Sequence, residues 1–405
     1  MAHQHAPWPY DRLDVAALRA QGVAPVPFRQ FVLKVHSRCN LACSYCYIYE
    51  GPDGSWRDRP ATVSARTVER TAERIAEHAR AHRLPAVEAV LHGGEPLLTG
   101  VEPLLRLRDA IRARLDAGTE LTTTTQTNAT LLTEERVTRL ADARIRVGVS
   151  LDGGLPRHNR ARVDHAGRPS FDAVARGLRL LAERPDAYAG ILSTADPATD
   201  PDELYDSLLA FRPPALDFLL PHANWSAPPP HADPAGRRTA YGDWLARLFD
   251  RWWDAGPGAP RIRLFEEAVL LLLGAPSATE ALGTSPLATV VVEADGAIEQ
   301  VDSLKSAYEG AAATGLDVFR HPFDAALDHP GVAARQLGAR ALCDTCLACP
   351  VQRVCGGGNY AHRYRAGSGF HHPSVYCADL RRLIRHAARR LEESAGRARH
   401  TAAAR

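Results

Sequence analysis

The chain alternates short apolar runs with longer segments whose apolar residues recur every three or four positions. The short runs have the length of buried β-strands, and the longer spacing places apolar side chains on one face of an α-helix. The strand-like runs are Phe31–His36, Val87–Leu91, Leu121–Thr125, Ile145–Leu151, Tyr188–Ser193 and Leu216–Leu220. Six strand–helix units in succession predict parallel strands joined by right-handed crossovers.

These predicted strands are almost continuously apolar, as expected for strands that are covered on both faces. We therefore expect an α/β fold, a partial (β/α)6 barrel, with its chemistry in the loops at the carboxyl ends of the strands. A later hairpin is predicted where Val290–Val292 and Ala297–Val301 flank the turn residues Asp295 and Gly296. The expected parts are an N-terminal extension over 1–28, the barrel over 29–255, a linker with the hairpin over 256–340, a small cysteine-rich domain over 341–394 and a disordered tail over 395–405.

Composition narrows the class of protein. The 405 residues are 45% hydrophobic and 24% charged, which is typical of a globular chain with one large core or two smaller ones. No apolar run approaches the ~18–20 residues of a membrane span, and Met1–Tyr10 lacks the apolar segment of a signal peptide. We expect a cytoplasmic protein with no membrane partner. A net charge of +2 gives no reason to expect a nucleic-acid partner. Only two lysines occur, Lys34 and Lys305, and we interpret their scarcity as codon bias.

Eight cysteines fall into two groups that are separated by nearly three hundred residues. Without a secretory signal, clustered thiols are expected to bind metal or to perform redox chemistry. Cys39, Cys43 and Cys46 follow the first predicted strand with the spacing C-x3-C-x2-C. Three thiolates can hold three irons of a [4Fe–4S] cluster and leave the fourth iron open for a non-protein ligand. The alternative is a zinc site whose fourth ligand comes from His36 or from farther away.

The rear group supplies four thiolates with the spacing C-x2-C-x5-C-x21-C: Cys346, Cys349, Cys355 and Cys377. Four thiolates are enough for one closed iron–sulfur cluster or for a zinc knot. Cys343 lies outside this set, either as a spare thiol or as a substitute for one of the four.

The front motif, with Tyr45 before its last cysteine, resembles the signature of radical S-adenosylmethionine (SAM) enzymes. The resemblance covers roughly Phe31–Leu220. It implies that SAM binds the open iron of a [4Fe–4S] cluster and is cleaved to a 5′-deoxyadenosyl radical. The implied contacts with SAM are Tyr45 near adenine, Gly93, Gly94 and Glu95 at the methionyl amine, Gln126 and Asn128 at the end of the third strand, Ser150 at the ribose and Arg162 at the carboxylate. Taken alone, a glycine pair or an asparagine is typical of an ordinary turn.

The rear cysteines, joined to such a barrel, resemble the SPASM or twitch extension, which carries auxiliary iron–sulfur clusters. A complete SPASM domain holds two of them. This chain departs from that pattern, because the predicted hairpin contains no cysteine and Asn359 stands where a further cysteine is expected. We therefore expect one catalytic and one auxiliary [4Fe–4S] cluster, the latter on Cys346, Cys349, Cys355 and Cys377.

Longer stretches around these motifs are similar to FxsB-type peptide maturases. The stretches are Asp217–Trp225, Val292–Asp302, Cys355–Tyr364 and Pro373–Leu380. The resemblance implies a ribosomally made precursor peptide as substrate and a flavodoxin- or ferredoxin-type electron donor. The implied product is a cyclophane, in which an aromatic ring carbon is joined to the Cβ of the residue two positions on. Only about 28 residues precede the first predicted strand, so we expect the leader of the precursor to dock on the barrel, the hairpin or another protein.

Joining the ring to Cβ releases one electron and one proton, so the reaction needs a base. His222, Asp217 and His362 are the candidates, although each residue also has an ordinary structural explanation. Two other functions remain open. One is a different radical SAM maturase, forming thioether cross-links or formylglycine, and the other is a non-catalytic zinc-binding adaptor.

Overall fold

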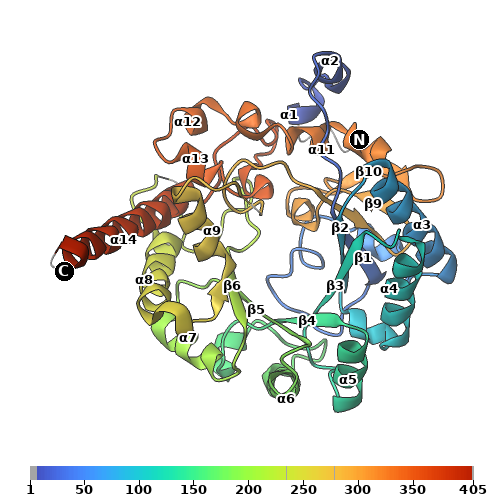
Figure 1. Ribbon diagram of the computed structural model, residues 1–405, viewed down its shortest axis with the longest axis horizontal. Coiled ribbons are helices and arrows are strands. Elements are labelled where there is room, and N and C mark those ends of the chain that lie inside the picture. Colours follow the sequence, from blue (N-terminus) through green and yellow to red (C-terminus); the bar gives the residue numbers. More distant parts are fainter. Residues whose placement is uncertain (1–6, 234, 278, 404–405) are drawn as a thin grey trace.

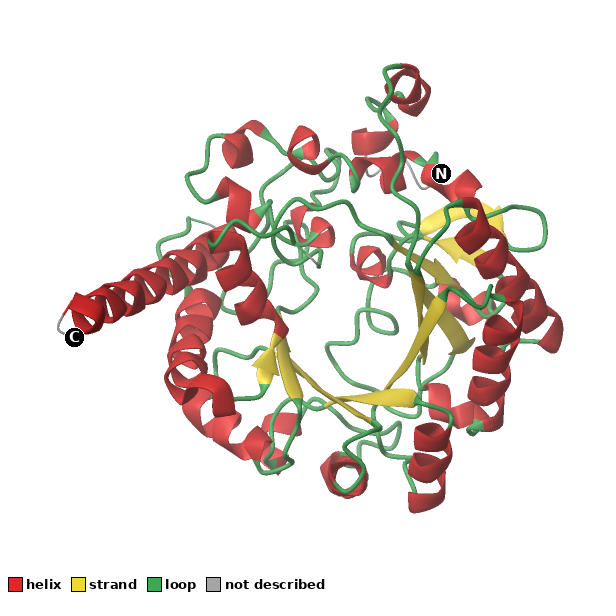
Figure 2. Cartoon of the chain, in the orientation of Figure 1, coloured by secondary structure: helices red, strands yellow, loops and turns green. Residues whose placement is uncertain are grey.

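The computed structural model describes residues 7–403 except 234 and 278. The described strands form one ten-stranded sheet in the order β10-β9-β8-β1-β2-β3-β4-β5-β6-β7, which curves into an incomplete ring (Figure 2). The strands are β1 (Gln30–His36), β2 (Ala86–Gly93), β3 (Glu120–Thr127), β4 (Ile145–Ser150), β5 (Tyr188–Thr194), β6 (Ala215–Leu219), β7 (Arg261–Ile262), β8 (Thr289–Val292), β9 (Ala297–Glu299) and β10 (Ala313–Asp317).

Helices cover the outside of this ring (Figure 1). The longer helices are α3 (Ala65–Ala81), α4 (Glu102–Arg114), α5 (Glu134–Asp142), α6 (Phe171–Ala182), α7 (Pro201–Leu209), α8 (Ala240–Ala255), α9 (Arg263–Leu272) and α14 (Cys377–Ala403). The shorter helices are α1 (Pro7–Tyr10), α2 (Val15–Ala20), α10 (Asp324–Leu327), α11 (Pro330–Ala334), α12 (Asp344–Leu347) and α13 (Gln352–Cys355).

Helix α3 illustrates how the sequence specifies a crossover. The Ser64 hydroxyl accepts a hydrogen bond from the Thr67 amide at 3.0 Å and caps the first turn. The apolar face predicted from the spacing, which includes Val68 and Ile75, is buried in the core. Each large apolar side chain buried in this way stabilises the fold by about 1.5–3 kcal/mol.

The six predicted strands and the predicted hairpin are confirmed, and strands β1 to β6 are parallel. The segment 256–340 is more than a linker, because its strands belong to the barrel sheet. Strand β7 pairs with β6, and β8 pairs in parallel with β1. The hairpin is thereby joined to the strand that leads into the front cysteines.

The predicted disordered tail over 395–405 is wrong for its described part, because helix α14 continues to Ala403. Alanine and arginine, which dominate this stretch, have high helix propensity, and the single Gly396 does not end the helix. Helix α14 packs along α8, where the Trp253 indole donates to the Ser394 hydroxyl at 3.2 Å.

The N-terminal extension packs against the rear half of the chain. Arg19 forms an ion pair with Asp328 at 2.9 Å, and the Trp8 and His371 rings lie 5.2 Å apart. Among the helices that the structure describes, none combines the length and the apolar character required to cross a membrane.

Candidate active site

The three front cysteines lie in the loop that follows β1. The loop is pinned to the segment after β4, since the Ala42 amide donates to the Val163 carbonyl at 2.7 Å. All three cysteines line a large cavity at the carboxyl ends of the barrel strands, with an empty volume of about 1180 Å³ including open solvent.

The spacing of the sulfur atoms bears on the two metal alternatives. Among the described residues, no three cysteine sulfurs lie within 4.8 Å of one another. A tetrahedral zinc site with Zn–S bonds of about 2.3 Å would place its sulfurs about 3.8 Å apart. The wider spacing fits thiolates that bind different irons of one cluster.

Most of the residues predicted to contact SAM lie around the same cavity. The predicted residues that line it are Tyr45, Gly93, Gly94, Gln126, Asn128, Ser150 and Arg162. The Ser150 hydroxyl accepts a hydrogen bond from the Gln126 amide at 2.9 Å, and the Asn128 amide donates to Asn40 at 2.8 Å. These contacts join the ends of β3 and β4 to the cysteine loop.

Glu95 is the exception. Its side chain is fully buried and is absent from the cavity lining. Its carboxylate accepts hydrogen bonds from the Leu97 amide, the Thr127 hydroxyl and the Asn128 amide, at 2.7–2.9 Å. Burial raises the pKa of Glu95, and these three donors oppose that shift. In this structure the carboxylate fixes the loop after β2, and its predicted contact with SAM stays a prediction.

The two glycines after β2 are needed for a close backbone approach. A β-carbon on Gly93 would overlap the His36 carbonyl, and one on Gly94 would overlap the Arg38 carbonyl and the Tyr49 hydroxyl. Only glycine therefore allows the main chain after β2 to pass directly beside the cysteine loop.

Arg162 provides a buried positive charge at the cavity. It donates to the Tyr45 hydroxyl at 2.7 Å, and Tyr45 hydrogen-bonds in turn to Asp152. Burial works to lower the pKa of Arg162, but Tyr45 and Asp152 raise it overall, so the guanidinium stays charged. The buried Nε of Arg162 has no hydrogen-bond partner within the described part of the chain. That orphaned donor fits the predicted role of binding a carboxylate. The sequence did not lead us to predict Asp152 as a site residue, although its position just after β4, at the carboxyl end of a barrel strand, could have indicated it.

The rear cysteines form a second site from three short elements. Cys346 lies in α12, Cys355 ends α13 and Cys377 begins α14. Together with Cys349 they line a cavity of about 360 Å³, whereas Cys343 does not contribute to its lining. The arrangement agrees with four ligands and Cys343 outside them, which remains a prediction.

The glycines after Cys355 have a structural role. Gly356, Gly357 and Gly358 all have positive φ, between 59° and 85°. The buried Arg363 guanidinium donates to the carbonyls of all three, at 2.7–3.2 Å. The residues of this motif therefore wrap the backbone around the rear site.

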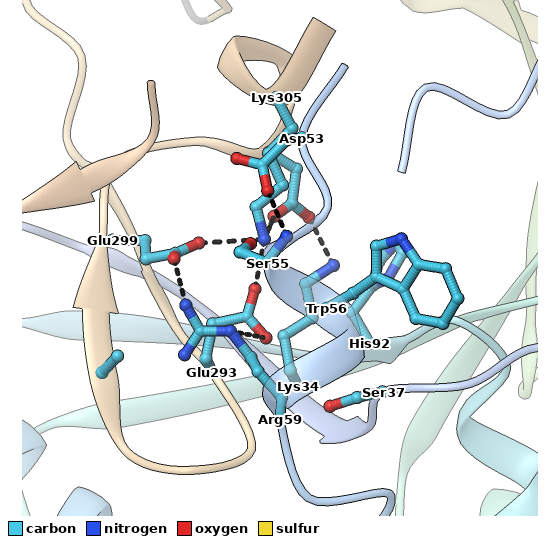
Figure 3. A network of polar contacts seen from close by, with 12 residues as sticks. Lys34, Ser37, Asp53, Ser55, Trp56, Arg59, His92, Glu293, Glu299 and Lys305 are labelled. Carbon is cyan, nitrogen blue, oxygen red and sulfur yellow. Dashed lines mark hydrogen bonds and ion pairs between the residues drawn. The ribbon is translucent and has the colours of Figure 1, made fainter. Parts of the chain in front are cut away.

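Beside the hairpin lies a buried ion network (Figure 3). Lys305 contacts Glu293 at 2.5 Å and Glu299 at 2.9 Å. Arg59 contacts Glu299 at 2.5 Å, and Lys34 pairs with Asp302. Three cations thus pair with three buried carboxylates, and Arg59 also contacts the exposed Asp295 at 2.6 Å. Lys34 and Lys305, the two lysines of the chain, both lie in this network. Codon bias can explain why lysines are scarce, but it does not explain why both are buried in ion pairs.

The three base candidates differ in what they contact. Asp217 is held by Arg263 at 2.5 Å and by the Leu264 amide at 3.2 Å, which ties β6 to α9. His222 lines the large cavity, and its Nδ1 lies 3.2 Å from Nε2 of His362.

A partial barrel with three cysteines after its first strand is the architecture of radical SAM enzymes. Residues 33–194 match the model of the Radical SAM superfamily. The fold of the chain is therefore the radical SAM α/β fold.

Two curated relatives are anaerobic sulfatase-maturating enzymes. The serine-type enzyme of Klebsiella aerogenes is 26% identical over 375 residues, which cover 88% of this chain and 87% of the relative. The cysteine-type enzyme of Clostridium perfringens is 27% identical over 290 residues, which cover 68% and 74%. These relatives do not confirm the FxsB-type resemblance.

Two solved structures share the fold. Native anSMEcpe with bound AdoMet has a TM-score of 0.75 at 21% identity, covering 91% of this chain and 99% of that one. Streptococcus suis SuiB bound to its precursor peptide SuiA has a TM-score of 0.60 at 16% identity, covering 89% and 78%. The alignments cover about nine tenths of this chain, so the shared fold extends well beyond residues 33–194.

Proposed function

We propose that this protein is a radical SAM maturase that oxidises a side-chain β-carbon of a peptide or protein substrate. The observation that carries the proposal is the cavity at the carboxyl ends of the strands. It brings three cysteines together with a buried, charged arginine and the main chain of two glycines. When bound, the cluster and SAM supply a carbon radical that removes a hydrogen atom from the substrate, a reaction beyond acid–base catalysis.

The chain's own residues would bind and orient these groups. Cys39, Cys43 and Cys46 would hold the cluster. Arg162, with its orphaned buried Nε, would bind the carboxylate of SAM, and the backbone at Gly93 and Gly94 would lie beside it. The far end of the cavity, which is lined by residues after β6 such as Pro221, would hold the target side chain within reach of the radical.

Formylglycine formation is the product that the curated relatives support. Two sulfatase-maturating enzymes match this chain, one of them over 88% of its length. The substrate would then be a serine or cysteine side chain in a sulfatase-like protein.

Cyclophane formation on a precursor peptide is the second candidate. It is favoured by the FxsB-like stretches and by the hairpin, where buried ion pairs stand in place of the cysteine of a complete SPASM domain. Streptococcus suis SuiB, a structural neighbour, is bound to the precursor peptide SuiA, which supports a precursor peptide as the substrate.

The test uses anaerobically reconstituted full-length protein with SAM and dithionite. One arm contains a sulfatase peptide with its target serine or cysteine, and the other contains the precursor peptide encoded beside this gene. We expect 5′-deoxyadenosine formation to depend on one of the two peptides. Oxidation of serine and cyclophane formation both remove two hydrogens, so capture of the product with a hydrazide separates an aldehyde from a cross-link. Thiol alkylation and tandem fragmentation then detect a thioether.

Iron and sulfide analysis tests the non-catalytic alternative. Protein that binds zinc without iron, or that holds its iron and forms no 5′-deoxyadenosine with either peptide, would contradict the proposal.

A further inference from the structure

We propose that His222 is the base that accepts the proton released during substrate oxidation, and that His362 shares this proton with His222 across their contact. The inference rests on the proposed function, but it holds for either product. After removal of a hydrogen atom, formylglycine formation and cyclophane formation each still release one electron and one proton.

His222 lies between two cavities. It follows β6 at the carboxyl end of the barrel and lines the cavity that holds the front cysteines. It also lines a second cavity, with an empty volume of about 600 Å³, together with His362, Asn359 and Arg263. A proton taken up on His222 therefore has a second residue, His362, on the side away from the front cysteines.

The two imidazoles are arranged for transfer between them. His222 Nδ1 and His362 Nε2 are 3.2 Å apart, so either ring can donate a hydrogen bond to the other. When His222 donates it, the Nε2 of His222 keeps a free lone pair. A proton arriving at that Nε2 would allow the Nδ1 proton to pass to His362, which lines the second cavity.

Packing holds both rings in place. The Tyr47 ring meets His222 edge-on with centroids 4.5 Å apart, and the Tyr376 ring meets His362 at 5.0 Å. Asn359 caps the turn that carries His362 by accepting from the Ala361 amide at 3.0 Å. The pair is therefore positioned by residues from the front loop, the rear domain and the start of α14.

Both imidazoles are neutral at neutral pH and can accept a proton. Burial lowers the pKa of His222 to about 4, with Glu280 and Asp302 opposing the shift. Burial, His222 and Arg363 lower the pKa of His362. A weak base suffices, because a protonated carbonyl or a cyclohexadienyl cation is a strong acid.

The carboxylates and the other imidazole discussed for these cavities already have partners. Asp152 hydrogen-bonds to Tyr45. His92 Nδ1 lies 2.8 Å from the Gly93 amide nitrogen and 2.9 Å from the Gly93 carbonyl oxygen, so this ring nitrogen is held by the Gly93 main chain. Asp217 lines the second cavity and is paired with Arg263.

The step balances in atoms and charge. In cyclophane formation the Cβ radical first adds to the aromatic ring, and the resulting ring radical loses one electron to a one-electron acceptor of the iron–sulfur class and one proton to His222, which restores the aromatic ring. In formylglycine formation the Cβ radical of a serine loses one electron to the same class of acceptor and its hydroxyl proton to His222, which leaves a C=O bond. A cysteine gives a C=S bond in the same way, and water hydrolyses it to C=O with release of hydrogen sulfide.

The test compares wild type with His222→Gln and His362→Gln, with His82→Gln on the outer helix α3 as the matched control. Three quantities are measured on anaerobic holoenzyme: iron content, substrate affinity and the ratio of product to 5′-deoxyadenosine. We expect His222→Gln to keep its iron, its substrate affinity and substrate-dependent 5′-deoxyadenosine, while the ratio falls about 100-fold. His362→Gln should lower the ratio by about tenfold, and His82→Gln should leave it unchanged.

An unchanged ratio in His222→Gln would overturn the inference. If that variant loses its iron, His222→Ala is assayed with and without added imidazole; restored coupling supports the assignment, and lack of rescue overturns it. Absence of substrate-dependent 5′-deoxyadenosine in the wild type is a different result, because it refutes the proposed function itself.

Discussion

Replacing Lys305 with methionine removes one charge from the buried ion network and keeps an unbranched side chain of similar length. Lys305 lies 2.5 Å from the carboxylate of Glu293 and 2.9 Å from that of Glu299, and all three side chains are at most 5% exposed. Removing one partner of a buried pair leaves an uncompensated charge and costs about 3–5 kcal/mol. We therefore expect Lys305→Met to lower the free energy of unfolding by that amount.

The cost should depend on pH. Burial raises the pKa of Glu299 to about 7 even though Lys305 opposes the shift, so loss of Lys305 raises it further. The unfolded chain has a glutamate pKa of about 4.3. At pH values between this pKa and the raised pKa of the folded state, the folded protein binds more protons than the unfolded chain. Stability consequently falls as pH increases through that window. Lys305→Met should be more destabilised at pH 8 than at pH 6.

Urea unfolding followed by circular dichroism measures the effect. With an m-value of about 3 kcal/mol/M, the midpoint should shift by about 1–1.7 M. The matched control is Arg212→Met, which breaks an ion pair with Glu183 whose side chains are 66% and 76% exposed and should cost less than about 1 kcal/mol. If Lys305→Met shifts the urea midpoint no more than Arg212→Met does, the reasoning is refuted.

Three further predictions concern the cofactor sites. Cys43→Ala should lose the front cluster and all substrate-dependent 5′-deoxyadenosine, which chromatography detects; retention of the wild-type rate would contradict the radical SAM assignment. Cys355→Ala should fall from about eight irons per chain to about four, whereas Cys343→Ala should keep about eight; about twelve irons in the wild type would refute this ligand count. Gly94→Ala should weaken SAM binding at least about tenfold, because its β-carbon would overlap neighbouring backbone. Gly118→Ala, with nothing within 4 Å of its β-carbon, is the control, and equal affinities in a binding titration would argue against the close approach.

The parts that the sequence predicted depend on local patterns. Cys39, Cys43 and Cys46 lie close together in the chain, and Gly93 and Ser150 lie at the ends of apolar strands that the periodicity identifies. Once the strands are parallel, their carboxyl ends meet at one edge, so the cavity follows without further information.

The parts that were missed depend on distant partners. Gln30 pairs with Thr289 where β8 adds to β1, and no local pattern indicates that pairing. Lys34 and Asp302 look like surface charges in a sequence, because charged residues are seldom buried unless they are paired. Glu95 was assigned to SAM by resemblance, but only the structure shows its carboxylate bound to three protein donors.

The burial of both lysines has a practical consequence for labelling. Lys34 and Lys305 are the two lysines of the chain, and they are only 5% and 3% exposed. Succinimidyl esters, which react with accessible amines, should therefore leave the lysine side chains of the folded protein unmodified. Acylation of Lys305 would instead report that the hairpin has separated from the barrel, which makes the reagent a residue-specific probe of local opening.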